Sequence, residues 1–304
     1  MNPFQSITPQ PPVPGLVSLV GAGPGHPDLL TVRGLRRLQA ATVILPDALL
    51  DESFEDLYPA GARVIPVGKR GGRPSTAQEH IQALMVEHAR RGERVVRLKN
   101  GDPLLFGRGF EEAQALAEAG IPFEVVPGVS ALQAGAAAAE ISLTHRGLAD
   151  EVRALEGRHL LERPRDWESL ARNGATLALF MATAQLQPIA RRLLEAGAPP
   201  DLPLVLVEQA SRPGQTVTRS VLAFAAGGHL QPLTEGPGIV YLGPAAALRM
   251  QPHERPSEDS EPIAAVLRPE RLACAAGGRR GDRHRQAAAA ARGGRPGALG
   301  GDPA

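Results

Sequence analysis

Several loops in this sequence carry residue types that can do chemistry. GAGPGHPD at residues 21–28 contains glycines that let the backbone approach a ligand closely, and the helical pattern after it would aim N–H groups at the loop. It is not a dinucleotide fingerprint, because the sixth position of G-x-G-x-x-G is His26, and no Gly-Lys-Ser/Thr follows to make a Walker loop. Alone, the loop fits a tight strand-to-helix turn as well as a ligand site.

The second loop, LKNGDPLLFGRGFEE at residues 98–112, follows a predicted strand, and open α/β sheets bind ligands at the carboxyl ends of their strands. Asp102 beside Gly101 can present a carboxylate together with free backbone groups. A plain β-turn with a helix cap explains the NGDP segment, but it explains the FGRG that follows much less well. This loop therefore favours a ligand site.

Two further loops carry small or cationic residues. PGVSA at residues 127–131 leads through an alanine-rich helix to SLTHRG at 142–147, and small residues in both places fit close packing against a backbone or a flat ligand. VGKRGGRPS at residues 67–75 contains one of the only two lysines in the chain, Lys69 and Lys99. Because the pKa of lysine moves readily on burial, Lys69 is a candidate for chemistry, whereas Lys99 is interpreted as structural.

The elements that must position these loops alternate between short apolar runs and helical patterns. Strands are expected at residues 16–20, 42–45, 62–67, 94–98 and 123–126, and helices at 29–40, 77–91 and 109–119. This alternation predicts crossover connections and a largely parallel sheet. Continuously apolar strands fit a sheet that is covered on both faces.

A second series of elements follows Gly128. Its strands are expected at residues 176–181, 203–208, 215–222 and 238–243, with a helix at 183–196. The strand after Arg212 follows its predecessor too closely for a helical crossover, so this half is expected to be mixed in strand direction. The predicted fold class is therefore α/β, with two α/β domains that meet near Pro127 and Gly128 and a ligand cleft between them.

The composition of the two ends sets the expected domain limits. Residues 1–15 contain five prolines and are expected to be a flexible leader, and residues 251–304 contain no aromatic residue. Such a tail cannot bury enough apolar surface to offset its ordering entropy. We expect an N-terminal α/β domain at 16–127, a C-terminal α/β domain at 128–250 and a disordered tail at 251–304.

The overall composition excludes several classes of protein. There are 33 Lys and Arg against 32 Asp and Glu, a net charge of +1, so a polyanionic partner must meet a local cluster of cations. The single cysteine, Cys274, excludes a disulfide framework and a cysteine-built zinc site, and no metal is expected. No apolar run approaches the roughly 18 residues of a membrane helix, and no basic-then-apolar leader is present, so a cytoplasmic location is expected.

The set of motifs, in its order, carries a resemblance. GAGPGHPDLLT, PDALL, VGKRGGR, GERVVRLKNGDPLLFGRGFEEA, GIPFEVVPGVSA and LTHRGLA together resemble the tetrapyrrole methylase family, and within it the members that methylate uroporphyrinogen III. The similarity runs from about Gly15 to Arg249 and is densest before Ala149. Each motif alone is weak, whereas six in register are specific.

The resemblance implies an enzyme that uses S-adenosylmethionine as co-substrate. It would methylate two ring carbons of uroporphyrinogen III and give precorrin-2, by way of precorrin-1, for sirohaem or cobalamin biosynthesis. The family fold has two α/β domains with the methyl donor in the cleft between them, usually in a homodimer. Neither a membrane nor a nucleic acid is expected as a partner.

The resemblance also assigns roles to matching residues. The donor contacts would be Pro24, Asn100, Gly101, Asp102, Leu105, Ser130, Ala131, Met181 and Ala210. The catalytic pair would be Asp47 as proton acceptor and Lys69 as proton donor. Substrate handling would fall to Arg70, Arg108, Glu111 and Arg146. Two alternatives stay open at this point, because Met181 ends an apolar strand and fits a core position, and Asp47 fits an N-cap for a helix starting near Ala48.

These residue types suit the implied chemistry. The sulfonium donor already favours methyl transfer, so the protein must mainly align the attacking carbon with the methyl group. The methylated ring is cationic until it loses a proton, which calls for a positioned base. Uroporphyrinogen bears eight carboxylates, and the arginine fork suits carboxylates best, so binding is expected to weaken as salt rises.

Three residues depart from the family pattern. His26 and Pro46 stand where the family usually has Asp and Tyr, and Asn100 stands where it usually has Gly. Asn tolerates left-handed backbone angles, so the change at residue 100 is mild. Pro46 fixes its own φ and favours an extended Leu45, which predicts a displacement of Asp47.

Two rival functions remain. One is another tetrapyrrole or precorrin methylase of the same fold, or a methylase of a different substrate such as diphthine, although the GKRGGR, FGRG and THRG segments favour uroporphyrinogen III. The other is nucleic-acid binding through the arginine-rich tail, residues 279–295, where charge alone supports only weak, salt-sensitive association.

Overall fold

The computed structural model describes residues 15–68, 77–172 and 174–250, which fall within one compact unit, Met1–Gln251. The predicted leader, the tail from residue 251 and the cationic loop with Lys69 and Arg70 lie outside the described residues. Among the described residues, no helix has the length and apolar character needed to cross a membrane.

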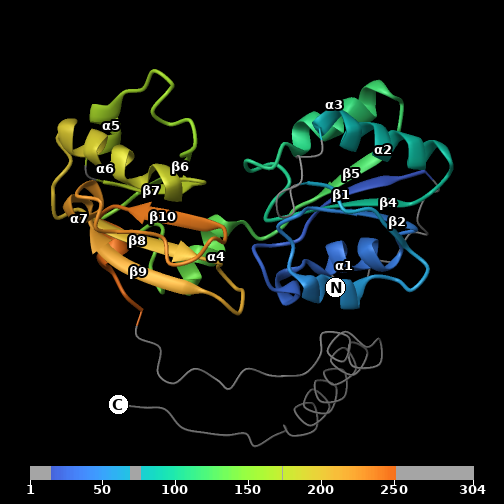
Figure 1. Ribbon diagram of the computed structural model, residues 1–304, viewed down its shortest axis with the longest axis horizontal. Helices are drawn as coiled ribbons and strands as arrows, with labels where there is room; N and C mark the ends of the chain where they lie inside the picture. The colour runs from blue at the N-terminus through green and yellow to red at the C-terminus, as the bar shows by residue number, and fades with distance from the viewer. Residues whose placement is uncertain (1–14, 69–76, 173, 251–304) are drawn as a thin grey trace, which may run out of the picture. The chain divides into compact units, whose positions relative to one another are not determined.

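The first half is built on a parallel five-stranded sheet (Figure 1). Its strands are β1 (Val17–Gly21), β2 (Val43–Pro46), β3 (Arg63–Val64), β4 (Val95–Lys99) and β5 (Phe123–Val126). They lie in the order β3-β2-β4-β1-β5, and every neighbouring pair is parallel. β1, β2 and β4 are buried along their whole length, as expected for a sheet covered on both faces. This arrangement confirms the predicted α/β class.

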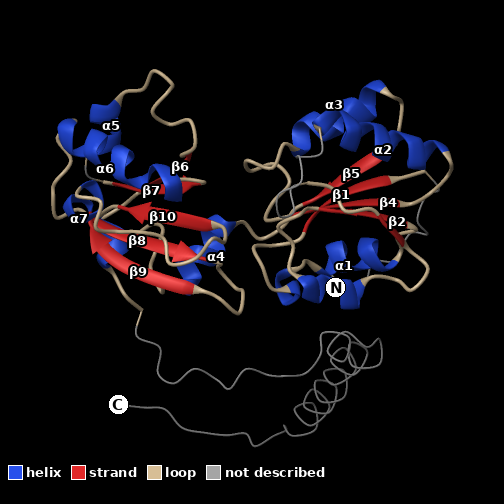
Figure 2. Cartoon of the chain, in the orientation of Figure 1, coloured by secondary structure: helices blue, strands red, loops and turns tan. Residues whose placement is uncertain are grey.

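Helices cover both faces of this sheet (Figure 2). The elements on the two faces are α2 (Gln78–Arg90) with α3 (Gly109–Glu118), and α1 (Val32–Gln39) with the short 3-10 helix Glu52–Leu57. On the α2 and α3 face, Met85 and Leu116 pack against strand residues such as Leu19. On the opposite face, Leu38 of α1 and Phe54 pack against the alternate strand side chains.

The second half is built on a mixed sheet. Its strands are β6 (Glu151–Glu156), β7 (Ala175–Phe180), β8 (Pro203–Glu208), β9 (Thr216–Val221) and β10 (Gly238–Leu242). They lie in the order β6-β7-β10-β8-β9; β6 and β7 are parallel and the other neighbouring pairs are antiparallel. The predicted mixture of strand directions is confirmed, whereas β6 was not expected from the sequence.

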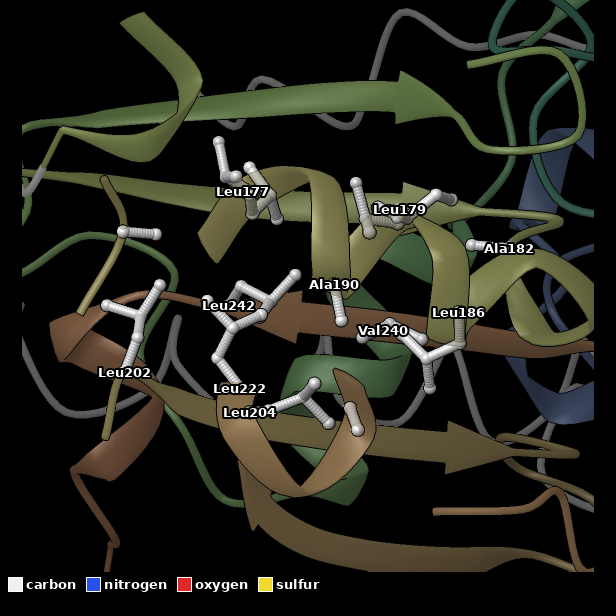
Figure 3. Close-up of a cluster of buried hydrophobic side chains, with 14 of the residues drawn as sticks. Leu177, Leu179, Ala182, Leu186, Ala190, Leu202, Leu204, Leu222, Val240 and Leu242 are labelled. Carbon is white, nitrogen blue, oxygen red and sulfur yellow. The ribbon is translucent and has the colours of Figure 1, made fainter. Parts of the chain in front are cut away.

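The helices of this half are α4 (Ala131–Ala138), α5 (Trp167–Ala171), α6 (Leu186–Glu195) and α7 (Leu222–Ala226). A core of leucines and alanines fills the space between the sheet and α5, α6 and α7, and it includes Leu179, Leu204 and Val240 of the strands with Leu186 and Ala190 of α6 (Figure 3). α4 packs on the other face, where Gly135 admits the Tyr241 hydroxyl because a Cβ would lie 2.4 Å from that oxygen. Each sheet thus has its own cores, and a domain boundary near residue 127 stays a prediction.

Candidate functional site

Three glycine-containing loops converge where β1, β4 and β5 end. These strands are neighbours in a parallel sheet, so their carboxyl ends lie at one edge. The Gly101 N–H donates to the Gly23 carbonyl at 2.7 Å, and the Gly23 N–H donates back at 3.3 Å. A Cβ on Gly128 would lie 2.3 Å from the Gly101 carbonyl oxygen, and a Cβ on Gly21 would lie 2.6 Å from Gly128 Cα. Only glycine permits this backbone-to-backbone contact.

Asp102 joins two of these loops. Its Oδ1 accepts the Leu104 N–H at 2.8 Å, which closes the turn after β4, and its Oδ2 accepts the Gly128 N–H at 3.1 Å. Ser130 follows in the third loop and caps α4 by accepting the Leu132 N–H at 3.2 Å. The carboxylate therefore holds the second loop against the entrance of α4.

These loops border a cavity of about 390 Å³, within the usual range for small-molecule sites. Among the described residues, Glu111 and Arg146 are the predicted site residues that do not line this cavity. The predicted site residues that do line it are Pro24, Asp47, Asn100, Gly101, Asp102, Leu105, Arg108, Ser130, Ala131, Met181 and Ala210. Lining residues for which the sequence predicted no role in the site include Gln78, Ile81, Arg97, Phe106, Phe180, Val207, Pro237, Gly238 and Ile239, together with Lys99, which was interpreted as structural. The cavity thus collects residues from both halves of the compact unit.

Left-handed backbone conformations gather at this cavity. Phe106, Arg108 and Met181 have φ values of 56°, 54° and 53°, and all three line it. Gln209 and Ser211, on either side of Ala210, have φ values of 50° and 59°. Non-glycine residues in this region are strained, and such strain is typical of functional sites. The side chain of Met181 is 39% exposed, so the alternative that it is a core residue is wrong.

The segment after β8 approaches the first loop closely. A Cβ on Gly25 would lie 2.7 Å from the Ala210 carbonyl oxygen, and the His26 N–H donates to Ser211 Oγ at 3.2 Å. His26 also caps the 3-10 helix that begins at Pro27, by accepting the Asp28 N–H at Nδ1. The change from Asp to His in this loop therefore keeps a capping acceptor.

Asp47 lies at the end of β2 with both carboxylate oxygens bonded. Oδ1 accepts from Arg97 Nη2, and Oδ2 accepts the Asn100 N–H at 3.0 Å. The Asp47 N–H still donates to the Leu98 carbonyl at 2.9 Å, so Pro46 has not displaced it from the strand register. The N-cap alternative is wrong, because the next helical turn begins at Glu52 and is capped by Asp51.

Behind Asp47 lies a set of buried charges that the sequence analysis did not predict. Arg97 Nε lies 3.1 Å from Glu112 Oε1, and Lys99 Nζ lies 2.8 Å from Glu112 Oε2. Burial lowers the pKa of Lys99, and the charge of Arg97 lowers it further. The sequence did contain a sign of this buried charge, because Arg97 and Lys99 are at positions i and i+2 of an apolar strand and so share one face of the sheet.

Arg108 and Glu111 pair with each other at the surface. Arg108 Nε donates to both Glu111 carboxylate oxygens at 3.0 Å, and this bond holds the pKa of Glu111 below its usual value. Arg146 lies in an exposed turn closed by the His145 and Ala149 backbones. Of these three residues only Arg108 lines the cavity, and the substrate roles of all three stay predictions.

The described part of the chain holds no group of three or more His, Cys, Asp or Glu side chains arranged around a metal position. The cavity is lined by glycine backbone, apolar side chains and the charged side chains of Asp47, Arg97 and Lys99. Apolar side chains combined with a few polar groups are typical of a site for a small organic molecule.

Comparison with known proteins identifies the family. Residues 16–226 match the sequence profile of the Tetrapyrrole (Corrin/Porphyrin) Methylases, and the chain belongs to this family. It is 47% identical over 208 residues to the uroporphyrinogen-III C-methyltransferase of Pseudomonas aeruginosa, covering 68% of this chain and 84% of that protein.

A longer relative and a solved structure extend the comparison. The chain is 43% identical over 260 residues to siroheme synthase 1 of Halorhodospira halophila, covering 84% of this chain but only 54% of that protein, so it spans about half of that relative. The crystal structure of the Thermus thermophilus uroporphyrin-III C-methyltransferase, complexed with S-adenosylhomocysteine, is 40% identical with a TM-score of 0.65. The match covers 75% of this chain and 97% of the Thermus thermophilus chain.

Proposed function

We propose that this chain transfers methyl groups from S-adenosylmethionine to two ring carbons of uroporphyrinogen III. The product would be precorrin-2, formed by way of precorrin-1, for sirohaem or cobalamin biosynthesis. The observation that carries the proposal is the cavity where the loops after β1, β4 and β5 meet, since the loops that resemble the methylases of this substrate form its walls. The identity to relatives that bear this activity in their names supports it further.

The cavity fits a methyl donor with an adenosyl group. Val207, Ala210 and Ile239 contribute apolar side chains to the lining, and Gly101 and Gly107 contribute glycine backbone. The residues that would hold the donor are Pro24, Asn100, Gly101, Asp102, Leu105, Ser130, Ala131, Met181 and Ala210. S-adenosylmethionine supplies a methyl group already activated on a sulfonium. The task of these residues is therefore alignment, which the short, strained loops favour by restricting motion.

Asp47 is the proposed proton acceptor. After a ring carbon gains a methyl group, the macrocycle is cationic until a proton leaves, and a carboxylate at the cavity wall can take that proton. Arg97 and the Asn100 N–H each donate to one of the two Asp47 oxygens and so orient the carboxylate. Lys69, the proposed proton donor, lies outside the described residues, so its role depends on the family resemblance alone.

Fixed cations would bind the substrate carboxylates. Arg108 lines the cavity, and Arg70 and Arg146 are the further cations that the family resemblance assigns to the substrate. Glu111 would act through Arg108, because it holds that guanidinium in place. Binding through such exposed cations weakens as salt rises.

The proposal includes a cytoplasmic homodimer, as the sequence resemblance implies. The molar mass of the purified chain, measured by light scattering across a range of concentrations, tests the assembly. A mass of twice the 31.9 kDa chain is expected, and a monomer at all concentrations would contradict this part of the proposal.

Incubation with uroporphyrinogen III and methyl-labelled donor tests the activity. Two methyl groups per macrocycle are expected, whereas a methylase of a later intermediate or of a different substrate would leave uroporphyrinogen III unmethylated. Deleting the residues after Met250 should not affect transfer, and RNA binding by the full chain alone would favour the arginine-rich tail as the functional part.

Calorimetry tests the donor loop separately. Asp102→Ala should weaken donor binding at least tenfold, because it removes the acceptor for the Leu104 and Gly128 N–H groups. Asp201→Ala, in the exposed turn before β8, is the matched control and should bind as the wild type does. Unchanged binding by Asp102→Ala would mean that the donor lies elsewhere.

A further inference from the structure

Four charged side chains form a continuous chain from the cavity wall into the interior. Asp47 binds Arg97, Arg97 lies 3.1 Å from Glu112, and Glu112 lies 2.8 Å from Lys99. Arg97, Lys99 and Glu112 are 3%, 2% and 0% exposed. Gln78 also donates to Glu112 at 3.2 Å. Signs alternate along the chain, so its net charge is zero.

A contribution to stability alone does not account for these four charged side chains. Burying ions costs several kcal/mol each, and apolar side chains of similar volume are often at least as stable in the same place. The position of the charges is informative, because Asp47, Arg97 and Lys99 all line the cavity while Glu112 reaches them from α3 behind the sheet. Moreover, burial and the Arg97 charge lower the pKa of Lys99, so its ammonium form depends on Glu112.

We propose that Lys99 and Glu112 are positioning residues for the methyl transfer, and that they act on Asp47 through Arg97. Glu112 holds the Arg97 guanidinium from one side so that its Nη2 meets Asp47 on the other. The Lys99 charge neutralises that of Glu112. Without it, Glu112 would draw Arg97 away from Asp47 and repel the Asp47 carboxylate. The inference rests on the proposed function, since it names the residues that hold the proposed base in its orientation.

The charges around Asp47 determine in which direction the pH profile of kcat should move. The charged and titratable groups near it in the described chain are Arg97 and Lys99 from β4, Glu112 from α3, Asp51 from the turn after β2 and Arg212 from the segment after β8. Removing the Lys99 charge leaves Glu112 to compete with Asp47 for Arg97. Asp47 should then accept its proton at higher pH, and the acid limb of the kcat profile should move to higher pH.

The test is the pH profile of kcat at saturating uroporphyrinogen III. Lys99→Met should move the acid limb up by about half a pH unit or more, and Lys99→Arg, which keeps the charge, should leave it in place. The double variant Lys99→Met with Glu112→Gln should return the limb toward the wild type, because it removes both signs. Lys99→Gln replaces Lys99→Met if the latter does not fold.

Controls separate this effect from general damage. Each variant should keep the donor Kd and the KM for the macrocycle within about twofold of the wild type, while Asp47→Asn should bind donor and lose transfer. The inference would be overturned if the acid limb of Lys99→Met did not move, or if the double variant showed the same shift as Lys99→Met. Methyl transfer by Asp47→Asn would overturn it as well. If the wild type does not methylate uroporphyrinogen III, the proposed function fails first and the inference falls with it.

Discussion

Arg212 Nη2 lies 3.2 Å from Asn100 Oδ1. The same nitrogen reaches the carbonyls of Leu49 and Pro24, so one side chain after β8 meets the loops that follow β1, β2 and β4. Asn100 is one of the departures from the family pattern, and a glycine at this position would lack the acceptor. The Arg212 guanidinium is therefore engaged with these loops.

Replacing Arg212 should therefore loosen the cavity wall. Arg212→Met should weaken donor binding about tenfold, because hydrogen bonds from a charged group are typically worth about 1.5–3 kcal/mol. Asn100→Gly should have a smaller effect, and combining the two should add little to Arg212→Met alone. Calorimetric donor Kd values for the four proteins of this cycle measure the coupling.

A matched control comes from α6. Arg192 pairs with Glu195 on an exposed face of that helix, and Arg192→Met should leave the donor Kd unchanged. Simple additivity of Arg212→Met and Asn100→Gly would show that the two side chains act independently.

Gly128→Ala should damage the site through a steric clash. The new Cβ would lie 2.3 Å from the Gly101 carbonyl oxygen and 2.7 Å from Gly21 Cα, and neither backbone can yield cheaply. We expect a loss of about 3 kcal/mol in the free energy of unfolding and loss of donor binding. Gly61→Ala is the control, because no atom lies within 4 Å of its Cβ. Equal urea midpoints for the two variants would contradict the close approach.

The sequence predicted the first sheet well because burial on both faces leaves continuous apolar runs. β3 spans only Arg63–Val64 instead of the predicted 62–67, although the Ile65 and Val67 N–H groups still donate to the Ile44 and Pro46 carbonyls of β2. β6 was missed because Glu151–Glu156 forms an edge strand that is nowhere fully buried, and its Glu, Ala and Leu residues are strong helix formers.

The loops at the site could be predicted from the sequence, because glycine, Asp and Arg residues cluster directly after the predicted strands. The partner of Lys99 was not, since Glu112 meets it only through the packing of α3 on β4, which no local pattern encodes. Lys99 was interpreted as structural, and its buried ion pair agrees with that, but the same side chain also lines the cavity. The contact of Arg212 with Asn100 joins residues 112 apart and was equally beyond local patterns.

Glu208 anchors the strand connection that covers one side of the cavity. It is fully buried at the end of β8 and accepts the Leu233 and Thr234 N–H groups at 3.0 and 2.9 Å, as well as the Thr234 and Thr216 hydroxyls. Burial works to raise the pKa of Glu208, but these hydrogen bonds outweigh it and hold the pKa below its ordinary value of 4.5. The anchored segment leads into Pro237 and Gly238, which line the cavity.

Glu208 should therefore make stability depend on pH in a defined direction. Because its pKa is lower in the folded state, the unfolded chain binds more protons below about pH 4.5, and the stabilisation by Glu208 is complete above that pH and is lost as the pH falls through the folded value. Glu208→Gln turns an NH2 toward backbone donors and should cost about 2 kcal/mol in urea unfolding at neutral pH. That difference should shrink in acid, whereas Glu195→Gln on exposed α6 should show a small difference at every pH. A Glu208→Gln deficit that stays constant from neutral pH into acid would mean that the buried group is not an ionised carboxylate.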